Sequence, residues 1–231
     1  MARGRIDLDA VAATLDALRH ERAARDAVPV LGEPADPLGD RMQRRLLAAY
    51  ALLDDAVANG LDLLAPGHSR ALLRINHTIL YGPRGRREPD NLRALRASEQ
   101  RFYEGDALAR STGVDGGVAD LVAWCDTHRR LPSAERAAGV YVRTLCTPQL
   151  FVEGNHRSAM LFASHELLHD GRPPFVLCVD NVAALRGCSA EIGRVARGGL
   201  ASWARARRLR RRVASIIRAS ADLTHIGHDN R

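Results

Sequence analysis

The sequence contains no lysine, so all 34 of its basic side chains are arginine. Against 27 acidic side chains they give a formal net charge of +7, a balance that suits nucleic-acid partners. Aromatic residues, however, make up only 4% of the chain, so the stacking platforms that bind single strands are scarce. The one-sided use of arginine beside abundant alanine is typical of a genome-wide compositional bias. Nucleic-acid binding is therefore not the expected role.

Long hydrophobic runs are also missing. No apolar stretch approaches the roughly 18 to 20 residues that a membrane-spanning helix requires. The first residues, Met1 to Arg5, are followed by Asp7 and Asp9 rather than by an apolar signal segment. We therefore expect a soluble, cytoplasmic protein without a membrane partner.

Cysteine pairs of the CxxC type are absent. The four cysteines are far apart and lie in apolar stretches, where a thiol behaves as a small hydrophobic group: Cys125, Cys146, Cys178 and Cys188. This pattern argues against a disulfide framework and against a cysteine-bound zinc. The 46% of hydrophobic residues in 231 can bury a substantial core, and we expect one main domain.

Alanine and leucine recur at three- and four-residue spacing, and alternating β-branched runs are rare, which predicts an all-α fold. The expected helices cover residues 9–26, 38–59, 70–80, 91–103, 118–128, 133–146, 155–169 and 200–220. Proline and glycine gather in residues 27–37, which we interpret as a linker. The predicted organisation is an N-terminal helical extension with its linker over 1–37, a main domain over 38–222 and a C-terminal tail over 223–231.

One segment carries the strongest chemical signal. It stands where a loop turns into the predicted helix 155–169 and reads Phe151-Val152-Glu153-Gly154-Asn155-His156-Arg157. The first N–H groups of a helix point outward and attract anions, and a glycine lets the backbone approach a ligand closely. Arg157 can hold a phosphate with two parallel hydrogen bonds, and Asn155 is a good donor or N-cap. Glu153, the one acid, fits a magnesium ion that is shared with phosphate oxygens.

The segment from Gln149 to Met160 resembles the signature of the Fic (Fido) domain family, His-x-Phe-x-Asp/Glu-Gly-Asn-Gly/Lys-Arg-x-x-Arg. Residues 136–141 and 171–175 are similar to the helix and the turn on either side of it. The resemblance implies a Fic-like helical domain over 38–222 that binds Mg²⁺ and a nucleotide such as ATP and transfers AMP or a related group. It further implies that Gly154, Asn155 and Arg157 hold phosphate, that Glu153 holds Mg²⁺ and that Phe151 packs into the core.

The chain departs from the signature at the position of the residue that transfers the proton in the family. Gln149 replaces the family's histidine and cannot act as the general base. A positioned general base typically raises the reaction rate by about a hundred- to ten-thousand-fold. Met160 replaces the second arginine, and His156 stands at the usual glycine or lysine, where it can serve as a substitute acid or base. Two interpretations stay open: an atypical transferase that acts on a protein or a phosphorylated small molecule, and a non-catalytic binding or regulatory module.

A rival motif lies on the same helix. His165-Glu166-Leu167-Leu168-His169 matches H-E-x-x-H, in which two histidines one turn apart bind zinc and the glutamate activates water. A zinc hydrolase also needs a third protein ligand, and no acid or histidine downstream stands at a characteristic spacing. The alternative interpretation is that His165, Glu166 and His169 form the wet edge of an amphipathic helix.

Overall fold

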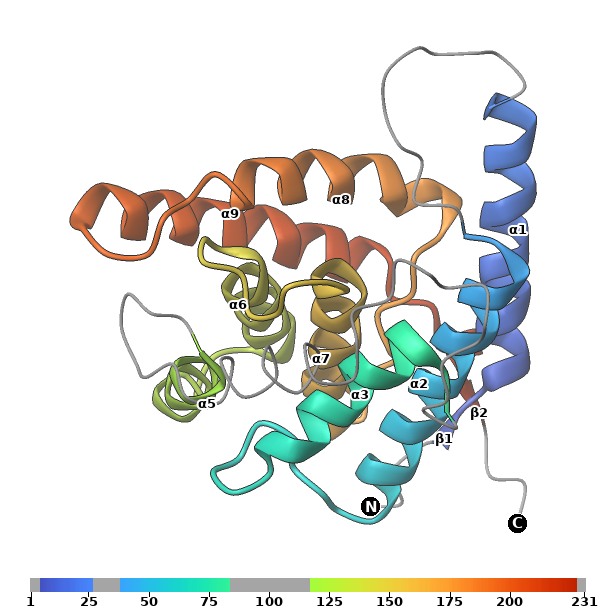
Figure 1. Ribbon diagram of the computed structural model, residues 1–231, viewed down its shortest axis with the longest axis horizontal. Helices are drawn as coiled ribbons and strands as arrows, with labels where there is room; N and C mark the ends of the chain where they lie inside the picture. The colour runs from blue at the N-terminus through green and yellow to red at the C-terminus, as the bar shows by residue number, and fades with distance from the viewer. Residues whose placement is uncertain (1–4, 27–37, 84–116, 228–231) are drawn as a thin grey trace.

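The computed structural model describes residues 5–26, 38–83 and 117–227 (Figure 1). These residues form eight α-helices, a short 3₁₀ helix η1 at Leu223–His225, and two short antiparallel strands, β1 at Arg5–Ile6 and β2 at Ile226–Gly227. The all-α prediction is confirmed. The helices are α1 Leu8–Asp26, α2 Asp40–Ala58, α3 Ser69–Tyr81, α5 Val118–Thr127, α6 Ser133–Leu145, α7 Asn155–His169, α8 Val179–Ile192 and α9 Leu200–Ala219.

The predicted helices agree with α1, α2, α3, α5, α6, α7 and α9 to within about two residues at each end, and the predicted helix 91–103 lies outside the described residues. None of the helices in the described ranges is both long and apolar enough to cross a bilayer. The arginine-rich helix predicted at 200–220 is α9, whose apolar stripe is buried at Leu209, Val213 and Ile217.

Helix α8 is not predicted by the sequence pattern. It contains Asn181 and Gly187, which have low intrinsic helix propensity. The side chain of Asn181 stabilises the helix start, because its Oδ1 accepts the N–H of Cys178 at 3.0 Å. Leu185 and Ile192 are buried, and α8 packs along α9. Tertiary contacts and the cap thus stabilise a helix that propensity alone does not favour.

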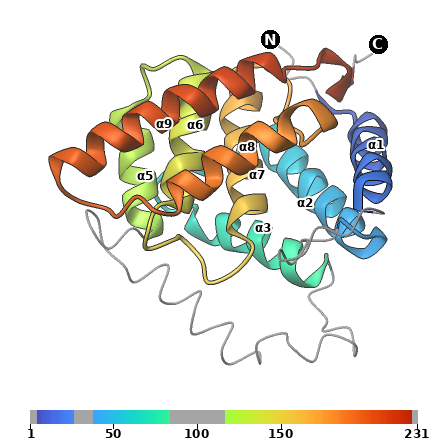
Figure 2. The same cartoon turned by 90° about the horizontal axis from the view of Figure 1, so that it is seen from above.

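Helix α7 lies in the middle of the other helices (Figures 1 and 2). Helix α6 packs along it, and α2 and α3 contact it from other sides. Twelve of its fifteen residues are buried, so it has no continuous wet face. A helix that is covered on its sides is expected to be apolar all round, but α7 also buries the polar side chains of Ser158, Ser164, His165 and Glu166. Its two ends reach the surface: the N-terminus, preceded by the 147–154 loop, exposes His156, and the C-terminus exposes His169.

The two ends of the described chain lie together. Ile6 in β1 pairs with Ile226 in β2, and the Ile6 N–H donates to the buried carboxylate of Asp54 at 2.8 Å. Helix α1 contributes Val11 and Leu15, both fully buried, to the same hydrophobic core as the other helices. The structure therefore packs the described parts of residues 1–37 and 223–231 against the main domain.

The burial of α1 gives a testable expectation. Leu15→Ala should lower the free energy of unfolding by about 2 to 5 kcal/mol, because it leaves a cavity in the shared core. The matched control is Leu200→Ala, since Leu200 is 88% exposed and the same atoms are removed. Urea denaturation of both variants measures the difference. Equal stabilities would show that α1 does not contribute to the cooperative core.

Candidate functional site

Helix α7 begins directly after a glycine in the left-handed conformation. Gly154 has φ 77° and ψ 10° and is the N-cap residue. A Cβ atom there would lie 3.0 Å from the Nδ2 of Asn76 and 3.2 Å from the Cδ2 of Leu80. Both the dihedral angles and the close approach of α3 therefore require glycine.

Asn155 braces the loop that leads into the helix. The side chain is only 4% exposed, and its Oδ1 accepts the N–H of Phe151 at 2.8 Å. Its Nδ2 donates to the Phe151 carbonyl at 2.7 Å and to the Oε1 of Gln149 at 2.9 Å. Both amide hydrogens are used inside the loop. A phosphate contact from Asn155 would therefore come from its backbone N–H, not from the side chain that the sequence favoured.

A second asparagine fastens the loop to α3. The Nδ2 of buried Asn76 donates to the carbonyl of Glu153 and to the Oγ of Ser158, both at 3.0 Å. These two bonds attach both Glu153, just before Gly154, and Ser158, on the first turn after it, to α3. Sequence analysis did not single out Asn76. Its signal is a polar side chain on the apolar face of α3, next to the buried Ile75.

The remaining motif residues lie toward solvent. Glu153 and His156 are exposed, and Arg157 is half-buried on the first turn of α7. The N-cap residue, Gly154, has no side chain to cap this turn. The first N–H groups of the helix and the helix dipole create a positive potential at this point, to which the guanidinium of Arg157 adds. The loop thus presents an acid, a histidine and an arginine around a cationic helix start.

The family's other positions fall in the interior. Phe151 is 7% exposed and meets Phe162 edge-on, with ring centroids 6.2 Å apart, so it packs into the core as the resemblance implies. Met160, at the position of the second arginine, is 1% exposed. No phosphate contact can come from that position. Of the two arginine positions in the family's signature, Arg157 is therefore the one that can contact a phosphate at this site.

The H-E-x-x-H residues are not a wet edge, which corrects that interpretation. His165 is 1% exposed, and its Nε2 accepts the N–H of Leu63 at 3.2 Å. Glu166 is also buried and accepts the Nε of Arg136 at 2.6 Å, whereas His169 is exposed. Burial raises the pKa of Glu166, and the guanidinium of Arg136 opposes that rise. The helix tolerates these polar groups because neighbouring helices and loops supply their partners.

This geometry does not favour the zinc alternative. The Nε2 lone pair of His165 is already used by a backbone N–H, and the carboxylate of Glu166 is used by Arg136. In the ranges that the structure covers, no three His, Cys, Asp or Glu side chains are grouped so that they could hold a metal ion. His165 and Glu166 are therefore better explained as structural residues of α7, and His169 is exposed at the end of the helix.

The loop brace can be tested by stability. Asn155→Ala should lower the free energy of unfolding by about 2 kcal/mol, because it leaves buried backbone groups of Phe151 without partners. Asn59→Ala is the matched control, since Asn59 is exposed at the C-terminal end of α2 and its side chain donates to the backbone carbonyl of Asp55. Chemical denaturation compares the two. A loss at residue 155 no larger than at residue 59 would contradict the bracing role.

Comparison of the chain with protein-family models, with curated proteins and with solved structures finds no match. What the site can do therefore has to be inferred from its own residues. These are a left-handed Gly154 at the N-cap of α7, a half-buried Arg157, and exposed Glu153 and His156 beside them.

Proposed function

We propose that the first turn of α7 binds the phosphates of a nucleotide or of another phosphorylated ligand. The observation that carries the proposal is the helix start itself: the N-cap residue Gly154 is left-handed and, as a glycine, has no side chain to cap the turn that follows. Backbone N–H groups in this arrangement form an anion site. Arg157, half-buried on the same turn, supplies a planar donor that matches phosphate oxygens.

Glu153 is suited to hold Mg²⁺ beside that phosphate. Its carboxylate is exposed next to the helix start, while its carbonyl is fixed by Asn76. Magnesium usually takes only one or two carboxylates and completes its shell with water and phosphate oxygens. A single acid is therefore a sufficient protein contribution. The ion would neutralise the phosphates, whose charge Glu153 would otherwise repel.

The resemblance to the Fic family extends the proposal to a reaction. In a transfer of that type a hydroxyl oxygen attacks the α-phosphorus of ATP, the bond to the β-phosphate oxygen breaks, and pyrophosphate leaves. The hydroxyl proton needs an acceptor, and Gln149 cannot be one. His156 is exposed on the first turn of α7 and its imidazole can accept a proton, so we assign it this role. The acceptor hydroxyl belongs to a protein or to a small molecule.

A second candidate, a binding or regulatory module without turnover, is supported by the position of Gln149. Its Oε1 accepts the amide of Asn155 and so takes part in the brace of the loop. A residue at the base position that stabilises the loop maintains the binding geometry without proton transfer. The two candidates share the phosphate site and differ only in turnover.

The phosphate site is tested by calorimetric titration with ATP, ADP, GTP and CTP in the presence of Mg²⁺. Arg157→Ala should weaken the affinity for a bound nucleotide roughly tenfold to a hundredfold, because a charged phosphate contact is lost. Arg172→Ala is the matched control: this arginine is exposed just beyond the other end of α7. Absence of binding by the wild type, or equal losses in both variants, would remove the proposal.

Turnover is tested by putting a histidine back at the base position. If the site is otherwise complete, Gln149→His should increase transfer of radiolabelled AMP from ATP to a protein acceptor by about a hundredfold or more. Removal of the proposed base with His156→Ala should abolish the wild-type activity and leave nucleotide affinity unchanged. If the wild type transfers no AMP and only Gln149→His does, the chain is the binding module.

A further inference from the structure

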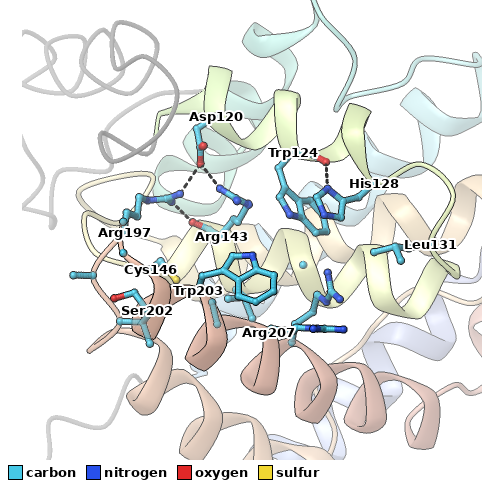
Figure 3. Close-up of a pocket in the computed structure, with 18 residues that line it drawn as sticks. Asp120, Trp124, His128, Leu131, Arg143, Cys146, Arg197, Ser202, Trp203 and Arg207 are labelled. Atoms are coloured by element: carbon cyan, nitrogen blue, oxygen red, sulfur yellow. Dashed lines mark hydrogen bonds and ion pairs between the residues drawn. The ribbon is translucent and has the colours of Figure 1, made fainter.

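A pocket lies away from the α7 site. It has a volume of about 660 Å³ and opens between α5, α6, residues 195–199 and the first half of α9 (Figure 3). This volume falls within the range of small-molecule sites in proteins. Both tryptophans of the chain, Trp124 and Trp203, line it. The sequence motifs gave no indication of this pocket.

The lining of the pocket is cationic. Among its described lining residues four are arginines and one is an acid: Arg143, Arg197, Arg207, Arg210 and Asp120. The Oδ2 of Asp120 accepts hydrogen bonds from the Nη1 of Arg143 at 2.7 Å and from the Nη1 of Arg197 at 2.6 Å. Two guanidinium groups therefore share one carboxylate at this end. The pocket carries an excess of positive charge and is suited to an anion.

The far side of the pocket adds a further cation. The guanidinium of Arg207 lies 5.5 Å from the ring centroid of Trp203, and Arg207 forms no ion pair with the residues that the structure describes. The start of α9 also lines the pocket through Gly199 and Ser202, and its N-cap residue, Gly199, has no side chain to cap the first turn. Positive potential is thus present on both sides of Trp203.

Flat apolar surfaces complete the pocket. Trp124 is 9% exposed and stacks on His128, with ring centroids 4.4 Å apart. A Cβ at Gly139 would lie 1.8 Å from the Trp124 ring, so α6 holds this indole tightly in place. Trp203, by contrast, is 62% exposed, an unusual exposure for so large an apolar ring. In Figure 3 its indole lies between the Asp120 cluster and Arg207, with Trp124 across the pocket.

We propose that this pocket binds a small organic anion that carries a flat aromatic ring. The acid group would bind to the guanidinium group of Arg207, and the ring would stack on the indole of Trp203 opposite Trp124. Such a ligand would cover the exposed indole and neutralise the excess charge at once. A neutral ring would make only the stacking contact with the indole, and a simple inorganic anion would make only the ionic contact with the guanidinium. The inference is independent of phosphate binding at α7.

The two tryptophans provide a direct reporter. In the full-length protein labelled with 5-fluorotryptophan, the ¹⁹F spectrum should contain two resonances, both from this pocket, and Trp203→Phe assigns them. The probe is naphthalene-2-sulfonate, which combines a flat ring with an anionic group. 2-Naphthol serves as the ring without the charge, and inorganic sulfate as the charge without the ring. We expect saturable shifts of both resonances with the sulfonate, at least tenfold weaker binding of 2-naphthol, and no shift with sulfate at the same concentration.

Variants test the assigned contacts. Arg207→Gln should weaken sulfonate binding about tenfold, the loss expected for one charged contact. Arg211→Gln is the matched control, because Arg211 is exposed on the same helix but does not line the pocket, and its affinity should stay within twofold. Both side chains are exposed, and thermal melts verify that the variants are folded. Arg157→Ala, at the α7 site, should leave this affinity unchanged.

Three outcomes would overturn the inference. The first is the absence of saturable shifts at millimolar sulfonate. The second is equal affinity for 2-naphthol, or equal losses for Arg207→Gln and Arg211→Gln, which would indicate a mere apolar patch. The third is broadening of the Trp203 resonance as protein concentration rises without ligand, which would assign the exposed indole to contact between copies of the chain.

Discussion

The covering of α7 on its sides is the constraint on which the rest of the structure depends. A helix in that position must be packed by its neighbours, and each of its polar side chains needs a partner from another element. Neighbouring elements supply hydrogen bonds to four of them: Asn76 bonds Ser158, the backbone of Phe175 bonds Ser164, the N–H of Leu63 bonds His165, and Arg136 pairs with Glu166. Dispersion and burial hold α7 in the core. The hydrogen bonds determine how the helix is rotated about its axis and where it lies along that axis.

The geometry of the candidate site follows from that placement. The Asn76 amide that bonds Ser158 also bonds the carbonyl of Glu153, so the position of α7 against α3 sets the conformation around Gly154. On the other side the N–H of Thr147 bonds the carbonyl of Val195, and the N–H of Arg197 returns a bond to Thr147. The loop that enters the α7 site is therefore also attached to the wall of the tryptophan-lined pocket.

Sequence periodicity was sufficient for the local structure. The bounds of α7, Asn155–His169, agree with the predicted range, because a glycine and an asparagine mark its start and the apolar pattern ends at Asp170. It was insufficient where distant residues meet. Asp120 and Arg197 are 77 positions apart and are joined by a hydrogen bond in the pocket wall. The local sequence around either residue does not predict this contact. The burial of His165 and Glu166 was missed for the same reason, since their partners come from other elements.

The burial of phenols and thiols in this core determines how the protein responds to alkali. Burial raises the pKa of Tyr50, Tyr141, Cys125 and Cys146. The unfolded chain releases these protons from about pH 8.5 for thiols and about pH 10 for phenols, while the folded chain retains them. Their contribution to stability is complete below those values and declines as the pH rises. The cations of the ion pairs that join α6 to its neighbours are guanidinium groups, which keep their protons over the same range. Alkaline unfolding would therefore begin with the neutral groups of the core and not with its salt bridges.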